Sequence, residues 1–324
     1  MKRFIFILGF LLFINGVFVG TPILRAQPYP NHPIQLVIPG APGDAVDIAA
    51  RSAAEELAKI LKIPIIPLNK PGGGSILGTE FAAKSKKDGY TLLYALSSGL
   101  IYNPAINPDS VPYDSIRDFE PLGLHVNFPT VISVRADSPW KHFSEMIDFA
   151  QKNPGKFRCG TLGVGSINHF QLEIIKSLTG VDITMVPFKG ASPAVTGLLG
   201  GHVEGTFIGR PVLEPHMRSG KLKGVLLDRK VADLPDIPTL RELGYTRDLP
   251  SPWAGIYAPA GIPEEAKKIL IPAIEKAINT PDLISRMQKM WFLPTYKPPA
   301  EHKQLLAEDY DNARTLIKKM GGIK

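Results

Sequence analysis

The segment Pro39–Asp47, with the sequence PGAPGDAVD, contains residues well suited to binding an anion. It joins the apolar segment Ile34–Ile38, predicted as a strand, to an amphipathic stretch predicted as a helix. The first N–H groups of a helix are unpaired and carry about half a positive charge, so such a loop can seat a carboxylate or a phosphate. An ordinary turn that binds nothing is the alternative for this segment taken alone. The candidate ligand-binding residues here are Ala41, Pro42, Gly43 and Asp44.

Further loops are expected at the same edge of the fold, because each follows a predicted strand. Ser166 can cap the helix predicted at Ser166–Leu178, and His169 on that helix could donate a hydrogen bond or serve only as a structural residue. Lys189 and Arg210 could each pair with a carboxylate, and Arg210 could do so through two hydrogen bonds. The candidates in these loops are Ser97, Ser98, Gly163, Gly165, Ser166, His169, Lys189, Gly190 and Arg210.

The sequence contains no recognisable catalytic or metal-binding pattern. Its seven histidines lack the HExxH spacing, and Ser166 lacks the flanking glycines of a hydrolase nucleophile elbow. The segment Gly72–Ser75 fits neither common nucleotide-loop pattern and is interpreted as a tight turn. The single cysteine, Cys159, lies in a predicted buried strand, where a thiol usually acts as a small apolar group. We expect no cofactor, no bound metal and no enzymatic activity.

The first residues have the three-part pattern of a secretory signal. A basic start, Met1-Lys2-Arg3, precedes the apolar run Phe4–Phe18 and the small residue Ala26. A membrane anchor is the alternative, but the run is interrupted by Asn15 and Gly16 and is short for a span. We expect cleavage near Ala26 and an exported protein.

Charge and length narrow the classes of partner. The 324 residues carry a formal charge of +7, which falls to +4 without the basic residues before Gln27. The remaining Lys and Arg side chains are scattered among acidic ones, whereas a nucleic-acid-binding protein would show a basic stripe. A small anionic ligand therefore fits better than a nucleic acid, and nearly 300 mature residues suggest two domains.

Strand and helix patterns alternate in two blocks, which predicts an α/β fold of two lobes with a ligand cleft between them. Residues 1–26 form the expected signal peptide. The first lobe is predicted to contain residues 27–127 and 230–324, and the second lobe residues 128–229. The second crossing is expected within residues 228–252, a proline-rich stretch. Three helices are expected between Glu264 and Ile317.

Short motifs in order along the chain resemble the periplasmic solute-binding receptors of tripartite tricarboxylate transporters, also called Bug proteins. They include Ala41-Pro42-Gly43, Asn69-Lys70-Pro71-Gly72, Asp88-Gly89-Tyr90, Asn153-Pro154-Gly155, Val186–Gly190 and Leu234–Thr239. The resemblance implies a two-lobed periplasmic binding protein similar to type II that closes on a small organic acid and delivers it to a membrane permease. It also implies that the loops Ala41–Asp44 and Gly163–Ser166 hold carboxylates through backbone amides and water.

Three positions depart from the pattern of the family. Asp44 stands where relatives commonly have a second glycine, Ile208 where many have aspartate, and Ile167 where a small hydroxyl residue is frequent. These changes leave the class of ligand open among mono-, di- and tricarboxylates, including aromatic acids. Our hypothesis places one carboxylate between two helix N-termini, with Arg210 or Lys189 selecting the rest of the ligand. A ligand sensor for a membrane signalling kinase and an exported hydrolase are the alternatives.

Overall fold

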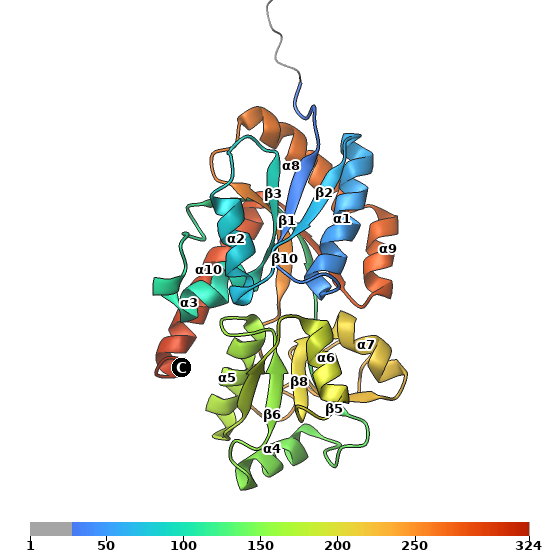
Figure 1. Ribbon diagram of the computed structural model, residues 1–324, viewed down its shortest axis with the longest axis vertical. Coiled ribbons are helices and arrows are strands. Elements are labelled where there is room, and N and C mark those ends of the chain that lie inside the picture. Colours follow the sequence, from blue (N-terminus) through green and yellow to red (C-terminus); the bar gives the residue numbers. More distant parts are fainter. Residues whose placement is uncertain (1–27, 324) are drawn as a thin grey trace, which may run out of the picture.

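Two separate β-sheets organise the chain into two lobes, one above the other in Figure 1. The computed structural model describes residues 28–323, so the predicted signal peptide at residues 1–26 lies outside the described residues. The first sheet has the strand order β11-β4-β10-β3-β1-β2, and the second has the order β7-β6-β8-β5-β9. This arrangement confirms the predicted two-lobed α/β fold.

The first lobe contains strands β1 (Ile34–Ile38), β2 (Ile65–Asn69), β3 (Thr91–Leu96), β4 (Phe119–Asn127), β10 (Trp253–Pro259) and β11 (Leu293–Lys297). Its helices are α1 (Ala45–Leu61), α2 (Ile76–Ala83), α3 (Asn103–Ile106), α8 (Glu264–Ile278), α9 (Pro281–Lys289) and α10 (Pro299–Lys319), with short turns η1 (Gly73–Ser75), η2 (Ser98–Tyr102) and η3 (Pro108–Ser110). The second lobe contains β5 (Thr130–Arg135), β6 (Arg158–Thr161), β7 (Thr184–Pro187), β8 (Gly205–Gly209), β9 (Leu222–Leu227), α4 (Phe143–Lys152), α5 (Ile167–Thr179), α6 (Ala191–Leu199) and α7 (Arg210–Arg218). None of the helices between residues 28 and 323 has the length and apolar character needed to cross a membrane.

The sequence pattern does not predict strands β4 and β11, and both contain proline. Pro121 of β4 lies beside a shift of register against β10, and β11 is an edge strand of the first sheet. Proline lacks an N–H group and is tolerated at such irregular or edge positions. The prolines weaken the strand pattern in the sequence without preventing strand formation.

Helix α1 places the first candidate loop against the cleft. Its apolar side chains, including Val46, Ala53 and Leu57, are buried in the core of the first lobe. The helix ends at Lys62, which adopts a left-handed conformation with φ of 57° and donates its N–H to the Ala58 carbonyl at 2.9 Å. Packing along its whole length fixes the direction in which its N-terminus points.

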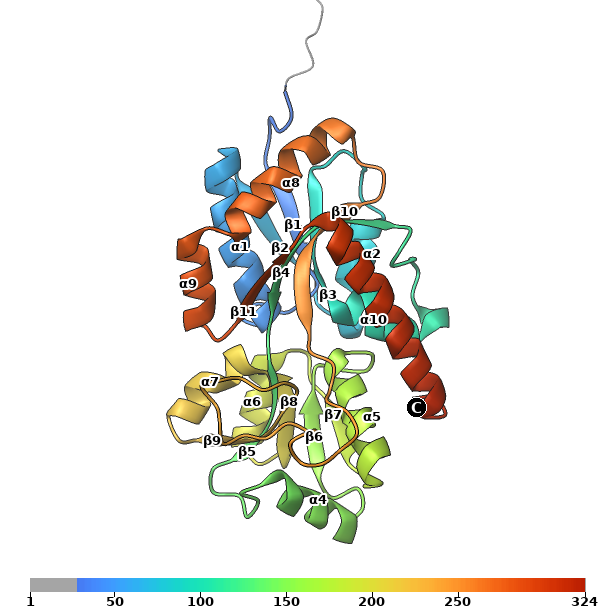
Figure 2. The same ribbon diagram turned by 180° about the vertical axis from the view of Figure 1, so that it is seen from behind.

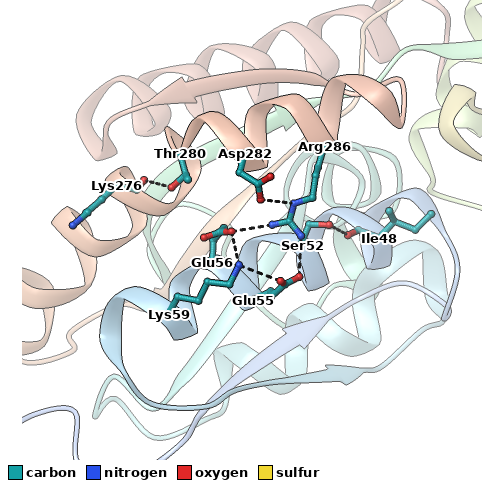
Figure 3. A network of polar contacts seen from close by, with 9 residues as sticks. All are labelled: Ile48, Ser52, Glu55, Glu56, Lys59, Lys276, Thr280, Asp282 and Arg286. Carbon is teal, nitrogen blue, oxygen red and sulfur yellow. Dashed lines mark hydrogen bonds and ion pairs between the residues drawn. The ribbon is translucent and has the colours of Figure 1, made fainter.

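The C-terminal part of the chain returns to α1 through a network of ion pairs (Figure 3). Arg286 on α9 contacts Glu55 at 2.9 Å and Glu56 at 3.0 Å, and its Nε lies 3.2 Å from Asp282. Lys59 also pairs with both glutamates. The Glu56 side chain is only 8% exposed, so these contacts are partly shielded from solvent. They join segments more than 200 positions apart within one lobe.

The chain crosses between the lobes twice, from β4 to β5 and from the second lobe into β10 (Figure 2). The crossings are adjacent, because the Phe128 N–H donates to the Pro252 carbonyl at 3.2 Å. The segment between β9 and β10 follows the second lobe, where Thr239 bridges Leu227 and Gln171 donates to the Pro250 carbonyl. These contacts place the second crossing near residue 252, at the end of the predicted range 228–252, so the residues from 230 to this point lie with the second lobe rather than the first.

A buried carboxylate connects the two crossings. Asp228, with no exposed surface, accepts a hydrogen bond from the Thr130 N–H at 2.9 Å and another from the Ser251 hydroxyl. Thr130 begins the second lobe after the first crossing, and Ser251 precedes the second crossing. Burial raises the pKa of Asp228 to about 7, although both hydrogen bonds favour its ionised form.

We expect Asp228→Asn to change how stability depends on pH. The folded protein holds the Asp228 proton up to a pH of about 7, whereas the unfolded chain releases it near pH 3.9. The folded state binds more protons between these values, so the contribution of Asp228 to stability decreases as pH rises through this window and is constant above it. Urea denaturation across the window should show this decrease in the native protein and a flatter profile in the variant. Asp236→Asn, at an exposed position, is the control, and parallel profiles for native protein and Asp228→Asn would contradict the prediction.

Candidate functional site

A cavity of about 610 Å³ lies between the two lobes. Its wall in the first lobe contains Pro39, Gly40, Ala41, Asp44, Ala45, Val46, Pro71, Gly72, Gly73, Gly74, Ser75, Leu96 and Ser98. The crossings and the second lobe contribute Phe128, Thr130, Pro252, Leu162, Gly163, Val164, Ser166, Ile167, Asn168, Pro187, Phe188, Lys189, Gly190, Ala191, Gly209 and Val212. Since both lobes supply the wall, a molecule held there contacts both at once.

Helix N-termini converge on this cavity because of the sheet topology. Strand β1 is parallel to β2 and β3, and β6 is parallel to β7 and β8. The carboxyl ends of each set face the cleft, and the helices that follow β1, β6 and β7 begin there. Figure 1 shows α1 of the first lobe above α6 of the second. Two sets of polarised N–H groups thus meet from opposite sides.

Several of these N–H groups have no partner. Among the hydrogen bonds of residues 28–323, none is donated by the backbone N–H of Ala45 or Val46 at the start of α1. The N–H of Asn168 in the first turn of α5 is likewise unpaired within that range. All three residues line the cavity and are buried. Buried donors without partners are costly, so these amides form a site prepared for an acceptor such as a carboxylate oxygen.

Asp47 holds the loop before α1 in place. Its carboxylate accepts hydrogen bonds from the Gly43 N–H at 2.9 Å, the Arg51 side chain at 2.9 Å and the Asn69 amide at 2.8 Å. Burial alone would raise the pKa of Asp47, but the bonds from Arg51, Gly43 and Asn69 lower it below the ordinary value. Asp47 therefore positions the loop and does not line the cavity.

Asp44 lies at the N-cap of α1 but does not cap that helix. One carboxylate oxygen accepts the Ala41 N–H at 3.1 Å, and the other accepts the Ala191 N–H at 2.7 Å, across the cleft at the start of α6. An N-cap aspartate normally accepts from the first-turn amides of its own helix. Because Asp44 turns toward α6 instead, the amides of α1 stay open to the cavity. Burial raises the pKa of Asp44, and the two amide hydrogen bonds oppose this shift.

The loop before α5 is held by its own side chains. Ser166 accepts a hydrogen bond from the His169 N–H at 3.2 Å and donates its hydroxyl to the Gly163 carbonyl at 2.7 Å, as the predicted cap requires. The His169 Nδ1 accepts the Gly165 N–H at 3.2 Å, and His169 is 2% exposed. Burial lowers the pKa of this imidazole, which agrees with a neutral ring accepting at Nδ1. His169 has the structural role, and it does not line the cavity.

The lobes contact each other closely beside the cavity. The Ser98 hydroxyl of the first lobe accepts the Ile167 N–H of the second at 3.1 Å. A Cβ added at Gly165 would lie 2.4 Å from Asn103 Cγ, and one added at Gly74 would lie 2.6 Å from the Val164 carbonyl oxygen. Glycine is required at both points for the two backbones to approach.

The structure corrects the role expected for Arg210. Its guanidinium donates to Glu214 at 2.7 Å and to both carboxylate oxygens of Asp233 at 2.8 and 2.6 Å. The residue is 3% exposed and does not line the cavity. Asp233 lies 23 positions along the chain, so the sequence around Arg210 does not reveal this partner. Lys189, in contrast, lines the cavity and is exposed, which places its charge at the rim.

The remaining candidates divide between the wall and its support. Ala41, Asp44, Ser98, Gly163, Ser166, Lys189 and Gly190 line the cavity. Pro42, Gly43, Ser97, Gly165, His169 and Arg210 are not part of the wall. Ser97, for example, is buried and accepts the Trp253 N–H at 3.4 Å. These supporting residues share loops with the wall, and sequence spacing alone does not separate the two groups.

Sequence reasoning missed part of the wall. The segment Gly72–Ser75, interpreted as a tight turn, does turn the chain before α2, but it also lines the cavity. Its run of glycines before a helix was the available signal. Phe128 was also missed, because a buried aromatic residue in the sequence resembles any other core residue. Phe188, in contrast, belongs to the segment Phe188–Gly190 that was expected at the cleft, and it does line the cavity. Phe188 owes its position to Gly160 and Gly197, where an added Cβ would lie 2.9 and 2.7 Å from its ring.

A second hollow, of about 850 Å³, lies open on the outer face of the first lobe around α2. Its wall comes from one lobe only and includes Lys70, Leu77 and Phe81. It is larger than the cleft but lacks the opposing helix N-termini. Within residues 28–323, no three His, Cys, Asp or Glu side chains are grouped so that they could hold a metal ion.

Comparison with known proteins agrees with this geometry. Residues 49–322 match the family described as tripartite tricarboxylate transporter family receptor. The chain belongs to this receptor family. It is 30% identical over 318 residues to Protein BugT of Bordetella pertussis, covering 96% of this chain and 97% of the relative.

Solved structures of such receptors share the fold. The periplasmic binding protein BugD is 28% identical and superposes with a TM-score of 0.85 over 91% of this receptor and 99% of BugD. MatC from Rhodopseudomonas palustris, solved with bound malate, is 28% identical with a TM-score of 0.83 over 89% of this chain and 100% of MatC. The family resemblance of the sequence motifs is therefore confirmed.

We expect Gly165→Ala to weaken ligand binding by hindering closure of this receptor. The added Cβ collides with Asn103 of the opposite lobe, in addition to the strain of a φ of 77°. Gly163→Ala is the matched control, because φ is 104° there but an added Cβ meets nothing within 4 Å. Strain of this kind costs roughly 1–2 kcal/mol in either variant. With an organic acid that stabilises the native protein, calorimetry should show a loss of affinity at least about tenfold greater for Gly165→Ala. Equal losses would contradict the role assigned to this contact.

Proposed function

We propose that this protein is an exported periplasmic receptor that binds a small organic carboxylate between its lobes and delivers it to a tripartite tricarboxylate-type membrane permease. The observation that carries the proposal is the set of unpaired amides of Ala45, Val46 and Asn168, which face one cavity from opposite lobes. A carboxylate has several acceptor sites and a negative charge, and both match helix N-termini.

The comparisons support the class of ligand and the cellular role. MatC was solved with malate, a carboxylate, and BugD is described as a periplasmic binding protein. The expected signal peptide would place this chain in the same compartment. Membership of the receptor family supports delivery to a permease. No pattern in the cavity favours turnover of the bound acid, because its wall lacks a nucleophile held by a neighbouring base.

We expect a carboxylate to bind because backbone N–H donors that are already fixed in position replace the water around it. In the open form the α1 and α5 amides are hydrated, and a carboxylate entering the cleft replaces that water. When the lobes close, the amides of both helices contact the same anion, and the Ser98–Ile167 hydrogen bond forms across the cleft. Since these donors are already oriented by packed helices, little entropy is lost in positioning them.

A thermal-stability screen followed by an uptake assay tests the proposed function. A ligand that binds only the folded protein raises its apparent stability, by about 2.7 kcal/mol at a concentration of one hundred Kd. We expect stabilisation by one or more organic carboxylates but not by the matching amides or alcohols. A strain lacking the receptor should then fail to take up that labelled acid. Normal uptake would refute delivery to a permease and leave the signalling alternative, whereas no stabilisation by any acid would refute carboxylate binding.

Ala45→Pro tests the contribution of a single helix amide. Ala45 is the first residue of α1, where proline is well accommodated, and Asp44 before it already has a compatible extended backbone with ψ of 158°. The substitution removes one N–H that faces the cavity while keeping the helix. A hydrogen bond to a charged group is worth about 1.5–3 kcal/mol, so affinity should fall about tenfold or more.

Ala45→Ser retains the N–H group and is the control for that substitution. It should bind the same acid with nearly native affinity in calorimetry. Unchanged affinity in Ala45→Pro would remove the start of α1 from the binding site, whereas equal weakening of both variants would point to the side chain rather than to the amide.

A further inference from the structure

We propose that Asp44 selects the ligand class of this receptor, which we infer to be monocarboxylates with a bulky apolar body. This inference rests on the proposed function and adds to it the chemistry of the rest of the ligand. The protein itself supplies a carboxylate at the start of α6, so a ligand with a second carboxylate meets an occupied position and a like charge.

The contacts of Asp44 show that an anion already occupies the start of α6. Its carboxylate oxygen lies 2.7 Å from the Ala191 nitrogen, in the other lobe and 147 positions along the chain. Close approach is possible because Gly190 has no side chain, and a Cβ there would lie 3.3 Å from that oxygen. Both oxygens of Asp44 accept N–H groups, which suits the ionised form. A ligand carboxylate cannot use the Ala191 donor while Asp44 holds it.

The other charges of the cavity do not compensate for Asp44. Among the lining residues only Asp44 and Lys189 are charged. Asp44 is 7% exposed, whereas Lys189 is exposed at the rim, where solvent screens its charge. A second ligand carboxylate buried near Asp44 would therefore be repelled without a buried cation nearby. The α1 and α5 amides remain available for one carboxylate.

The remaining wall suits an apolar body. Leu96, Phe128, Leu162, Ile167 and Phe188 all line the cavity, from both lobes and the first crossing. The volume of about 610 Å³ falls within the range that holds drug-sized ligands. The Phe188 ring is fixed against Gly160 and Gly197, so it offers a rigid apolar surface. An acid with an aromatic or branched body fills this space, whereas a small polar acid leaves apolar wall in contact with water.

Calorimetry with three probes tests the inference. The probes are 3-phenylpropionate, 3-(4-carboxyphenyl)propionate, which adds one carboxylate to the same body, and propionate, which lacks the aromatic body. The native protein should bind 3-phenylpropionate at least about tenfold more tightly than either of the others. Native binding of the dicarboxylate as tight as that of 3-phenylpropionate, or no binding of 3-phenylpropionate, would overturn the inference.

Two variants isolate the role of Asp44. Asp44→Gly frees the Ala191 N–H and removes the charge. In this variant the ratio of the Kd of the dicarboxylate to that of 3-phenylpropionate should fall by at least about tenfold. Asp44→Asn removes the charge but keeps the size of the side chain, and it should also lower this Kd ratio. If the glycine variant is unstable, the measurement relies on Asp44→Asn. An unchanged preference in both variants would overturn the inference. If other organic acids stabilise the native protein but 3-phenylpropionate is not preferred, the proposed receptor function stands and only this inference fails. If no organic acid stabilises the protein, both the proposed function and this inference are refuted.

Discussion

The structure depends on backbone amides that begin helices on opposite sides of one cleft and have no hydrogen-bond partner within residues 28–323. Parallel strands in both sheets end at that cleft, so the helices after them start there and direct their N–H groups inward. Such donors cannot remain buried and unpaired without cost. An anion between the lobes removes the cost in both lobes at once, which links binding to the relative position of the lobes.

Several polar side chains near the cleft hold these amides in place without lining the cavity. Asp47 holds the loop before α1, and His169 holds the loop before α5. Asn103 donates to the Gly73 carbonyl at 2.5 Å and packs against Gly165. Asp44 differs, because its carboxylate reaches the opposite lobe. Fixed loops keep the donors oriented before a ligand arrives, and this preorganisation favours affinity.

The chain connects the two lobes through two adjacent crossings. The buried carboxylate of Asp228 connects Thr130 at one crossing to Ser251 beside the other, so the two segments are held together as a unit. Contacts such as Ser98 with Ile167 form only where the lobes meet. Two apolar clusters lie mainly within one lobe each, whereas a third contains residues of both lobes, among them Tyr102 and Phe170, whose ring centroids lie 5.0 Å apart.

The sequence by itself determined the alternation of strands and helices, the division into two lobes and the family, because periodicity and short motifs are local properties. It also indicated the loops that reach the cleft, since each follows a strand. Only the tertiary structure decided which residues of those loops form the wall. Arg210 is held by Asp233, the glycines at 72–74 line the cavity, and the Asp44 carboxylate lies at the start of α6. Each of these outcomes depends on groups from distant parts of the chain that come together only on folding. The sequence around one group therefore does not show which group becomes its partner.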